Sequence, residues 1–226
     1  MLVAAAVCPH PPLLVPALAG AAAPELDGLR AACAAAVEAT LAVEHDRLVV
    51  VGGGQTTTAY GGQPAGTLRP WGVDVRVGEG DPVLPLSLTI GRWLLGDEVA
   101  ERAAFHEIAF DAEPGECLRL GERLVAEGRT ALLVMGDGSA CLTEKAPGYL
   151  DPAAQPYNDA IAAALGAGDA GALAALDHDE AAGLWVAGRA AFQVLAGAAE
   201  GTAPRGARLL ESIAPYGVGY FVATWA

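Results

Sequence analysis

Short apolar runs without polar alternation are the feature that most constrains the fold of this 226-residue chain. They include Leu2–Val7, "RLVVVGGG" at 47–54 and "TALLVMGDGSA" at 130–140, whose end is rich in glycine. A strand with one solvated face alternates apolar and polar residues, so these runs predict strands buried on both faces. The expected fold is therefore α/β, with a mostly parallel central sheet covered by helices on both faces.

The segments between these runs carry apolar residues at helical spacing. Pro24–Glu44 is one such segment, and Pro24 suits the first turn of a helix. Further helices are expected at 86–95, 116–127, 157–165, 170–176 and 180–199, and further strands at 73–77 and in the closing "YGVGYFVATWA". No repeat or linker divides the chain, so residues 1–226 are expected to form a single domain.

Charge and cysteine content narrow the function classes. The net charge is −14, and the basic residues are scattered, which argues against nucleic acid and anionic membranes as partners. The four cysteines form no CxxC pair, and the apolar start is too short for a signal peptide or a membrane span. We expect a cytoplasmic protein with reduced thiols.

Three strands end in unusual sequences: "CPHPP", "GGGQTTT" and "GDGSACLTEKAPGY". Ligands in open α/β sheets bind beyond the carboxyl ends of the strands. The three loops are therefore expected to converge on one pocket, with the loop at 56–72 as a flap over it.

The first of these loops places a thiol and an imidazole close together. His10 is held by two following prolines, so it suits a metal ligand or a base, or else a histidine hydrogen bonded at a strand end. Cys8 is two residues away, on the same side of an extended chain. It suits a nucleophile or a soft metal ligand, or else a small buried hydrophobe.

The other loops offer further polar groups. The glycines before Gln55 suit either a phosphate cradle or a tight turn, although the usual nucleotide-binding spacings are absent. The loop "GDGSACLTEKAPGY" could supply an acid and a base, and Asp137 and Ser139 are its candidate catalytic residues, but no GxSxG elbow surrounds Ser139. Asp179 and Glu180 suit a helix N-terminus.

Read together, these segments resemble the class III extradiol dioxygenase superfamily, which includes LigB-like and Memo-like proteins. "CPHPPLLVP" resembles its opening strand and loop, and "DRLVVVGGG" resembles its second strand. The most specific stretches are "GDGSACLTEKAPGY…", similar to the GDLSHRLT…APxGY region, and "APYGVGYFVA", similar to the closing PxGVGYxVA strand. The resemblance covers nearly the whole chain and implies a LigB-like fold.

The resemblance also implies an Fe(II) site formed by two histidines and a glutamate, with a catalytic histidine beside it. The first ligand matches His10. The second falls on Gly54, the catalytic histidine falls on Ala140, and the glutamate falls near Ala181, next to Glu180. Most of the side chains that ring cleavage needs are therefore missing.

Three functions remain open at this point. The chain is a divergent member that binds a small molecule without iron, an active oxygenase or hydrolase with a site rebuilt around His10, or a non-catalytic subunit of a complex or homodimer. His10 is the metal ligand if Fe(II) or another metal binds. The residues expected to line the ligand pocket are Cys8, His10, Gly54, Gln55, Ala140 and Glu180.

Overall fold

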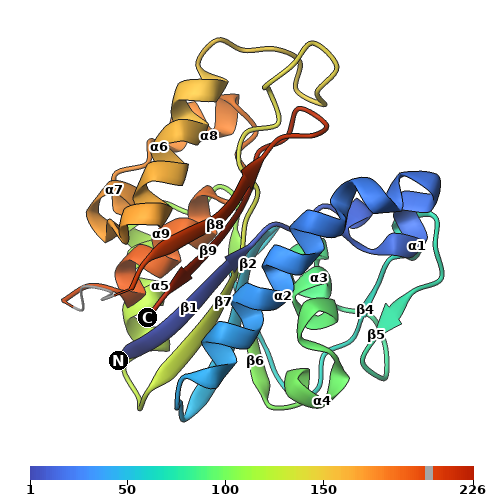
Figure 1. Ribbon diagram of the computed structural model, residues 1–226. Coiled ribbons are helices and arrows are strands. Elements are labelled where there is room, and N and C mark those ends of the chain that lie inside the picture. The colour runs from blue at the N-terminus through green and yellow to red at the C-terminus, as the bar shows by residue number, and fades with distance from the viewer. Residues whose placement is uncertain (202–205) are drawn as a thin grey trace.

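A computed structural model describes residues 1–201 and 206–226. Its centre is a seven-stranded sheet with the order β3-β6-β2-β7-β1-β9-β8 (Figure 1). The inner strands β6, β2, β7 and β1 are parallel, whereas β9 and β3 run antiparallel to their neighbours at either side. The strands are β1 (Leu2–Cys8), β2 (Arg47–Gly54), β3 (Thr58–Tyr60), β6 (Ala103–Ala109), β7 (Thr130–Met135), β8 (Arg208–Ile213) and β9 (Tyr220–Trp225).

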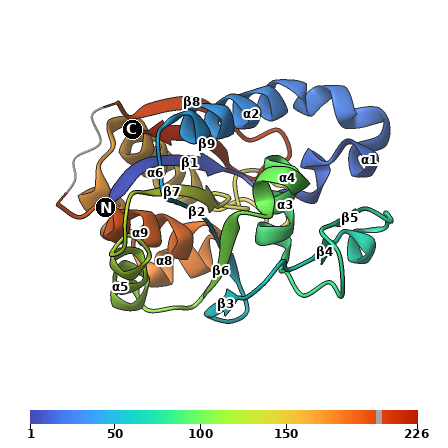
Figure 2. The same cartoon turned by 90° about the horizontal axis from the view of Figure 1, so that it is seen from below.

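Helices cover both faces of this sheet (Figure 2). One face carries α2 (Asp27–Ala42) and α3 (Leu86–Leu95), and the other carries α5 (Pro114–Leu124), α6 (Ala154–Ala167), α7 (Ala170–Ala174) and α9 (Arg189–Ala198). Short helices complete the chain: α1 (Pro16–Ala19), α4 (Asp97–Ala100) and α8 (His178–Gly183). The predicted α/β architecture is confirmed.

Strand β2 shows why its sequence lacks polar alternation. Val49 and Val51 pack into the core beneath α5 and α9, whereas Leu48 and Val50 pack into the core beneath α2 and α3. Successive side chains of a strand point to opposite faces, so a strand covered on both sides needs apolar residues at every position.

The element predictions hold best where the apolar pattern is strong. Helix α3 has the predicted bounds, 86–95, and α2 lies inside the predicted helix 24–44. Pro24 lies in a 3₁₀ helix (Gly20–Leu26) that precedes α2, so the prediction that it occupies the first turn is wrong. The strand predicted at 73–77 is reduced to β5 (Arg76–Val77), which pairs with β4 (Gly66–Thr67) in a separate ribbon. The segment predicted as a flap supplies β3 and β4 instead.

The single helix predicted at 180–199 is two helices. The break between α8 and α9 includes Trp185, whose φ of 53° lies in the left-handed region. A bulky residue adopts this conformation rarely, and no helix continues through it. The sequence analysis also missed β6 and β8.

The described residues form no helix that is both long and apolar enough to cross a membrane. All four cysteines are buried and free.

Candidate functional site

The carboxyl ends of β1, β2 and β7 lie along one edge of the sheet, with β7 in the middle. The loops after β1 and β7 contact each other directly, because the Gly136 amide donates a hydrogen bond to the Cys8 carbonyl at 3.0 Å. The loop after β2 turns the other way, and the Phe110 amide donates to the Gly54 carbonyl at 2.9 Å. The predicted convergence therefore occurs between two of the three loops, while the third joins the end of β6.

His10 and Asp137 form the polar centre of the first junction. The His10 backbone amide donates a hydrogen bond to Asp137 Oδ1 at 2.7 Å. His10 Nδ1 lies 3.6 Å from the same oxygen, beyond hydrogen-bond distance, and has no partner in the described part of the chain. Burial raises the pKa of the Asp137 carboxyl, and the nearby His10 opposes this effect. A hydrogen bond from Nδ1 to a carboxylate orients an imidazole for proton transfer or metal binding through Nε2, and at 3.6 Å His10 and Asp137 do not form that bond.

Cys8 and Ser139 have structural roles. The Cys8 side chain is fully buried in the core beneath α2, next to Cys33, so it is the small buried hydrophobe rather than a pocket nucleophile. The contact with the Cys33 thiol, together with burial, raises the pKa of Cys8, which disfavours the thiolate. Ser139 is also fully buried, where its hydroxyl donates to the Leu184 carbonyl at 2.7 Å and accepts from the Cys141 amide. The predicted catalytic role of Ser139 is therefore not supported by this geometry.

Gly54 lies against a side chain that is not among the predicted site residues. The buried Glu107 carboxylate of β6 accepts hydrogen bonds from the Thr56 amide at 2.9 Å and from the Tyr60 hydroxyl. A Cβ atom at position 54 would collide with Glu107 Oε1. Glu107 thus occupies the space into which a histidine at position 54 would project, while Gln55 is exposed.

The remaining predicted positions also carry no metal-binding side chain at this edge. Ala140 is half-buried, and its amide donates to the Leu184 carbonyl. Glu180 is exposed in the first turn of α8, where its amide donates to Asp177, the residue that caps the helix. The shift in register that would bring Glu180 into the site does not occur, because Ala181 is the buried residue.

The side chains at this edge do not fit an Fe(II) centre. Such a centre needs at least three converging ligands, and the described residues contain no group of three or more His, Cys, Asp or Glu able to hold a metal ion. His10 has one carboxylate beside it, Asp137. Glu107 is at the end of β6, three strand positions from β1 and thus about 14 Å away along the sheet.

An open cavity of about 360 Å³ lies next to this edge, beyond the ends of β2 and β6. Its volume lies within the range of small-molecule sites. Most of its wall is apolar, with three polar or charged residues among those that line it. The lining residues are Phe110, Ala181, Ala182, Trp185, Val186 and Ala187, with Asp111, His178 and Arg189.

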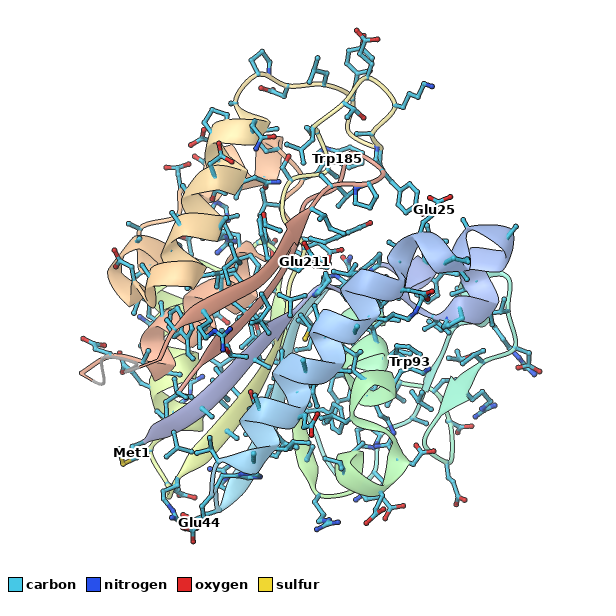
Figure 3. All side chains as sticks on the ribbon, viewed as in Figure 1. Met1, Glu25, Glu44, Trp93, Trp185 and Glu211 are labelled. Carbon is cyan, nitrogen blue, oxygen red and sulfur yellow. The ribbon has the colours of Figure 1, made fainter. Side chains whose placement is uncertain are left out.

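Two aromatic side chains form the rim of this cavity. Trp185 is 58% exposed and Phe110 is 41% exposed. Figure 3 shows Trp185 at the same end of the molecule as the loop after β7, away from both termini. Large exposed aromatic residues beside a concave apolar surface are typical of binding sites. Of the predicted pocket residues, none lines this cavity, but Ala181, the position of the expected glutamate ligand, does.

His178 and Arg189 are the basic residues of the cavity wall. His178 Nδ1 lies 3.0 Å from Asp179 Oδ1, and Nε2 lies 3.3 Å from the Asp111 carbonyl, so both ring nitrogens face acceptors. The contact with Asp179 raises the pKa of His178. Arg189 Nη1 donates to the Ala112 carbonyl at 2.6 Å and to Gln193 Oε1 at 3.0 Å, and Nη2 donates to the Phe110 carbonyl at 2.6 Å.

The sequence analysis missed Glu107, Phe110, Trp185 and Arg189. Glu107 lies in β6, whose sequence is "AAFHEIA". Its two polar residues interrupt the apolar run, so this segment was not predicted as a buried strand. Phe110 follows this strand. The only signal for Arg189 is its place inside an otherwise apolar segment, "GLWVAGRAAFQVLAGAA".

Comparison with known proteins shows the fold alone. No family model matches the chain, and no curated protein matches it. Among solved structures, it is similar to an uncharacterised protein, JW3007, from Escherichia coli K12. The TM-score is 0.60 and the identity 13%, over 99% of both chains.

Proposed function

We propose that this chain is a divergent LigB-like member of the class III extradiol dioxygenase superfamily that binds a small molecule without iron-dependent ring cleavage. The family assignment rests on the sequence stretches around "GDGSACLTEKAPGY" and "APYGVGYFVA". The observation that carries the loss of iron chemistry is the contact between Glu107 and Gly54, which fills the place of the second histidine ligand.

The apolar cavity beside Ala181 supports retention of a small-molecule site. In this proposal, the position of the lost glutamate ligand has become part of a hydrophobic wall. A mostly hydrophobic wall with a few polar groups is the usual composition of a site for a small organic molecule.

Anaerobic titration with Fe(II), followed by elemental analysis of protein purified without a His-tag, tests the loss of iron chemistry. We expect no stoichiometric binding and no oxygen consumption with catechol. Stoichiometric Fe(II) binding that is lost in His10→Ala would overturn this part of the proposal.

Ligand-detected NMR with a library of small aromatic fragments tests the retained site. We expect saturable binding that is lost in Ala182→Phe, which fills the cavity from α8. The matched control is Ala160→Phe, because Ala160 is also an exposed helical alanine but does not line the cavity. Absence of fragment binding to the wild-type protein would overturn the small-molecule function.

The His10–Asp137 contact favours a second candidate, an enzyme with a site rebuilt around His10. If the 3.6 Å contact shortened to a hydrogen bond, the Asp137 carboxylate would orient the imidazole as a general base of a hydrolase or as a metal ligand. A Fe(II), Zn(II) or Mn(II) titration that saturates at one ion per chain in the wild type, but not in His10→Ala, would favour this candidate over the first.

A further inference from the structure

Arg92 is a buried cation whose side chain forms no hydrogen bond within the described residues. It is 2% exposed and lies in the last turn of α3. The one carboxylate within 4.0 Å in this part of the chain is Asp97, whose Oδ1 lies 3.7 Å from Nη2, beyond hydrogen-bond distance. Nε and Nη1 are sealed from solvent and have no acceptor. An arginine keeps its charge in proteins, so burial in this state is costly.

Arg189 shows how a guanidinium of equal burial is satisfied elsewhere in the same protein. It is also 2% exposed, but its Nη atoms donate to two backbone carbonyls and to Gln193 Oε1. The guanidinium of Arg92 instead lies over the ring of Phe105, with Cζ 5.8 Å from the ring centroid. A ring face attracts a cation but accepts none of its in-plane protons. Buried donors without acceptors are rare in native proteins and indicate a functional role or a bound group.

The cover over Arg92 is the short segment 78–81, which follows β5 in the ribbon beside α3 and α4 (Figure 2). A Cβ atom at Gly78 would lie 2.7 Å from Arg92 Nε, so the backbone of this glycine rests directly on the guanidinium. The Gly78 amide donates a hydrogen bond to Asp97 Oδ1 at 3.2 Å. Gly78 and Gly80 have φ values of 70° and 94°, and every residue of the segment except Gly78 is exposed. Such weakly packed segments open locally at a low cost in free energy.

We propose that segment 78–81 opens and that Arg92 then binds a phosphate group, either the free ion or a phosphate ester. Lifting the Gly78 backbone uncovers Nε, and the ligand stabilises the open segment because it binds that state alone. Arg76 reaches the same segment, where its Nη2 donates to the Gly80 carbonyl. Two guanidinium groups offer more donors than the two oxygens of a carboxylate can use, which favours phosphate.

This site is distinct from the cavity beside α8. The residues of α3 pack into the core on one face of the sheet, whereas those of α9 pack into the core on the other. The inference therefore goes beyond the proposed small-molecule function and does not depend on it.

Asp97 is the internal competitor of the phosphate. Its carboxylate faces Arg92 Nη2 and accepts the Gly78 amide, so it holds the segment closed from the side on which an anion would bind. Glu79 and Asp81 lie in the covering segment itself and also repel an anion while it is closed. Neutralising Asp97 is therefore expected both to release the segment and to strengthen phosphate binding.

Thermal denaturation of the full chain in inorganic phosphate, with chloride at matched ionic strength as the reference, tests this site. A ligand that binds only the folded chain raises its melting temperature. We expect phosphate to raise the melting temperature of the wild type but not of Arg92→Met. The matched control is Arg102→Met, which removes an exposed arginine just after α4 and is expected to respond as the wild type does.

Two variants are expected to change the phosphate affinity in opposite directions, as measured by phosphorus NMR titration. Arg92→Met is expected to weaken binding at least about 10-fold, because the charged donors are lost. In chloride it is expected to melt at a higher temperature than the wild type, because an apolar side chain replaces an unpaired buried charge. Asp97→Asn is expected to bind phosphate about 3-fold more tightly, since a solvated carboxylate competes only weakly. If Arg92→Met does not fold, Asp97→Asn and the chloride reference decide the matter.

Three results would overturn the phosphate site. They are a wild-type response to phosphate no larger than that to chloride, an equal response in folded Arg92→Met, and an affinity that Asp97→Asn leaves unchanged or weakens. Methyl phosphate distinguishes the two sources of the group: binding as tight as that of inorganic phosphate supports an ester, and much weaker binding supports the free ion. The fragment screen tests the cavity beside α8 separately, so either proposal can fail without the other.

Discussion

The two polar regions at the carboxyl edge of the sheet differ in what surrounds them. At the His10–Asp137 junction, the loops after β1 and β7 bury the polar groups against each other, and the Asp137 carboxylate accepts a backbone hydrogen bond. At the cavity beside α8, the wall is mostly apolar and open, and the buried Arg189 is one of its few polar residues. His10, the residue most like a catalytic group, therefore lies in the more closed region. The more open region consists of residues that belong to no recognisable sequence motif.

The largest effect on stability is expected from placing a histidine at position 54, where the family resemblance puts the second ligand. Gly54→His forces its Cβ into Glu107 Oε1 and displaces the carboxylate from its hydrogen bonds with Thr56 and Tyr60. We expect the free energy of unfolding to fall by about 3 kcal/mol. Urea denaturation measures it, and the double variant with Glu107→Ala should recover part of the loss. A fully stable Gly54→His protein would show that the space is free after all.

The second prediction tests whether the His10–Asp137 junction and the cavity beside α8 are independent of each other. Asp137→Ala leaves the His10 amide without its acceptor, so we expect a loss of about 2 kcal/mol in unfolding free energy. Binding of the aromatic fragments should be unchanged, because Asp137 does not line the cavity. A large loss of fragment affinity in a folded Asp137→Ala protein would join the two regions into one site.

The pH dependence of Asp137 gives a related test. Its folded-state pKa is raised by burial, so the folded protein holds this proton more tightly than the unfolded chain does. Stability from this group is therefore lost as the pH rises from the unfolded value of about 3.9 through the raised folded value. Asp137→Asn keeps an oxygen acceptor and should remove this loss. Urea denaturation across the acid range compares the two proteins, and identical pH profiles would contradict the prediction.

A smaller effect is expected at the cavity wall. The pKa of His178 is raised, mainly by Asp179, so its contribution is fully present below the unfolded value of about 6.5 and disappears as the pH rises through the folded value. We expect His178→Gln to lose less than about 1 kcal/mol at low pH and less still at high pH, because the pair is solvated. Thermal denaturation at two pH values tests this, and a loss that grows with pH would contradict it.

The smallest effect is expected at Glu180. Its side chain is exposed on α8 and makes no ion pair among the described residues. Glu180→Gln should change unfolding free energy by no more than about 0.5 kcal/mol and should leave any response to Fe(II) unaltered. A lost metal response in this variant would revive Glu180 as a ligand.

Apolar periodicity determined the parts of the fold that depend on local sequence. The runs at 2–7, 47–54 and 130–140 predicted strands buried on both faces, and the pattern at 86–95 predicted a helix with its correct bounds. These predictions succeed because burial on two faces leaves an uninterrupted apolar run, and burial on one helix face leaves a 3.6-residue period. His10 and Asp137 were also found in advance, because each follows a strand within a loop of unusual composition.

Only the tertiary structure decided which of these residues share a site. Glu107 comes from a strand that the sequence hides, and it meets Gly54 because β6 pairs with β2. The break at Trp185 turns Ala181 and Arg189 toward one cavity, although the periodicity runs on through both helices. Strand order and backbone breaks are set by contacts between distant segments, and no local pattern of residues records them.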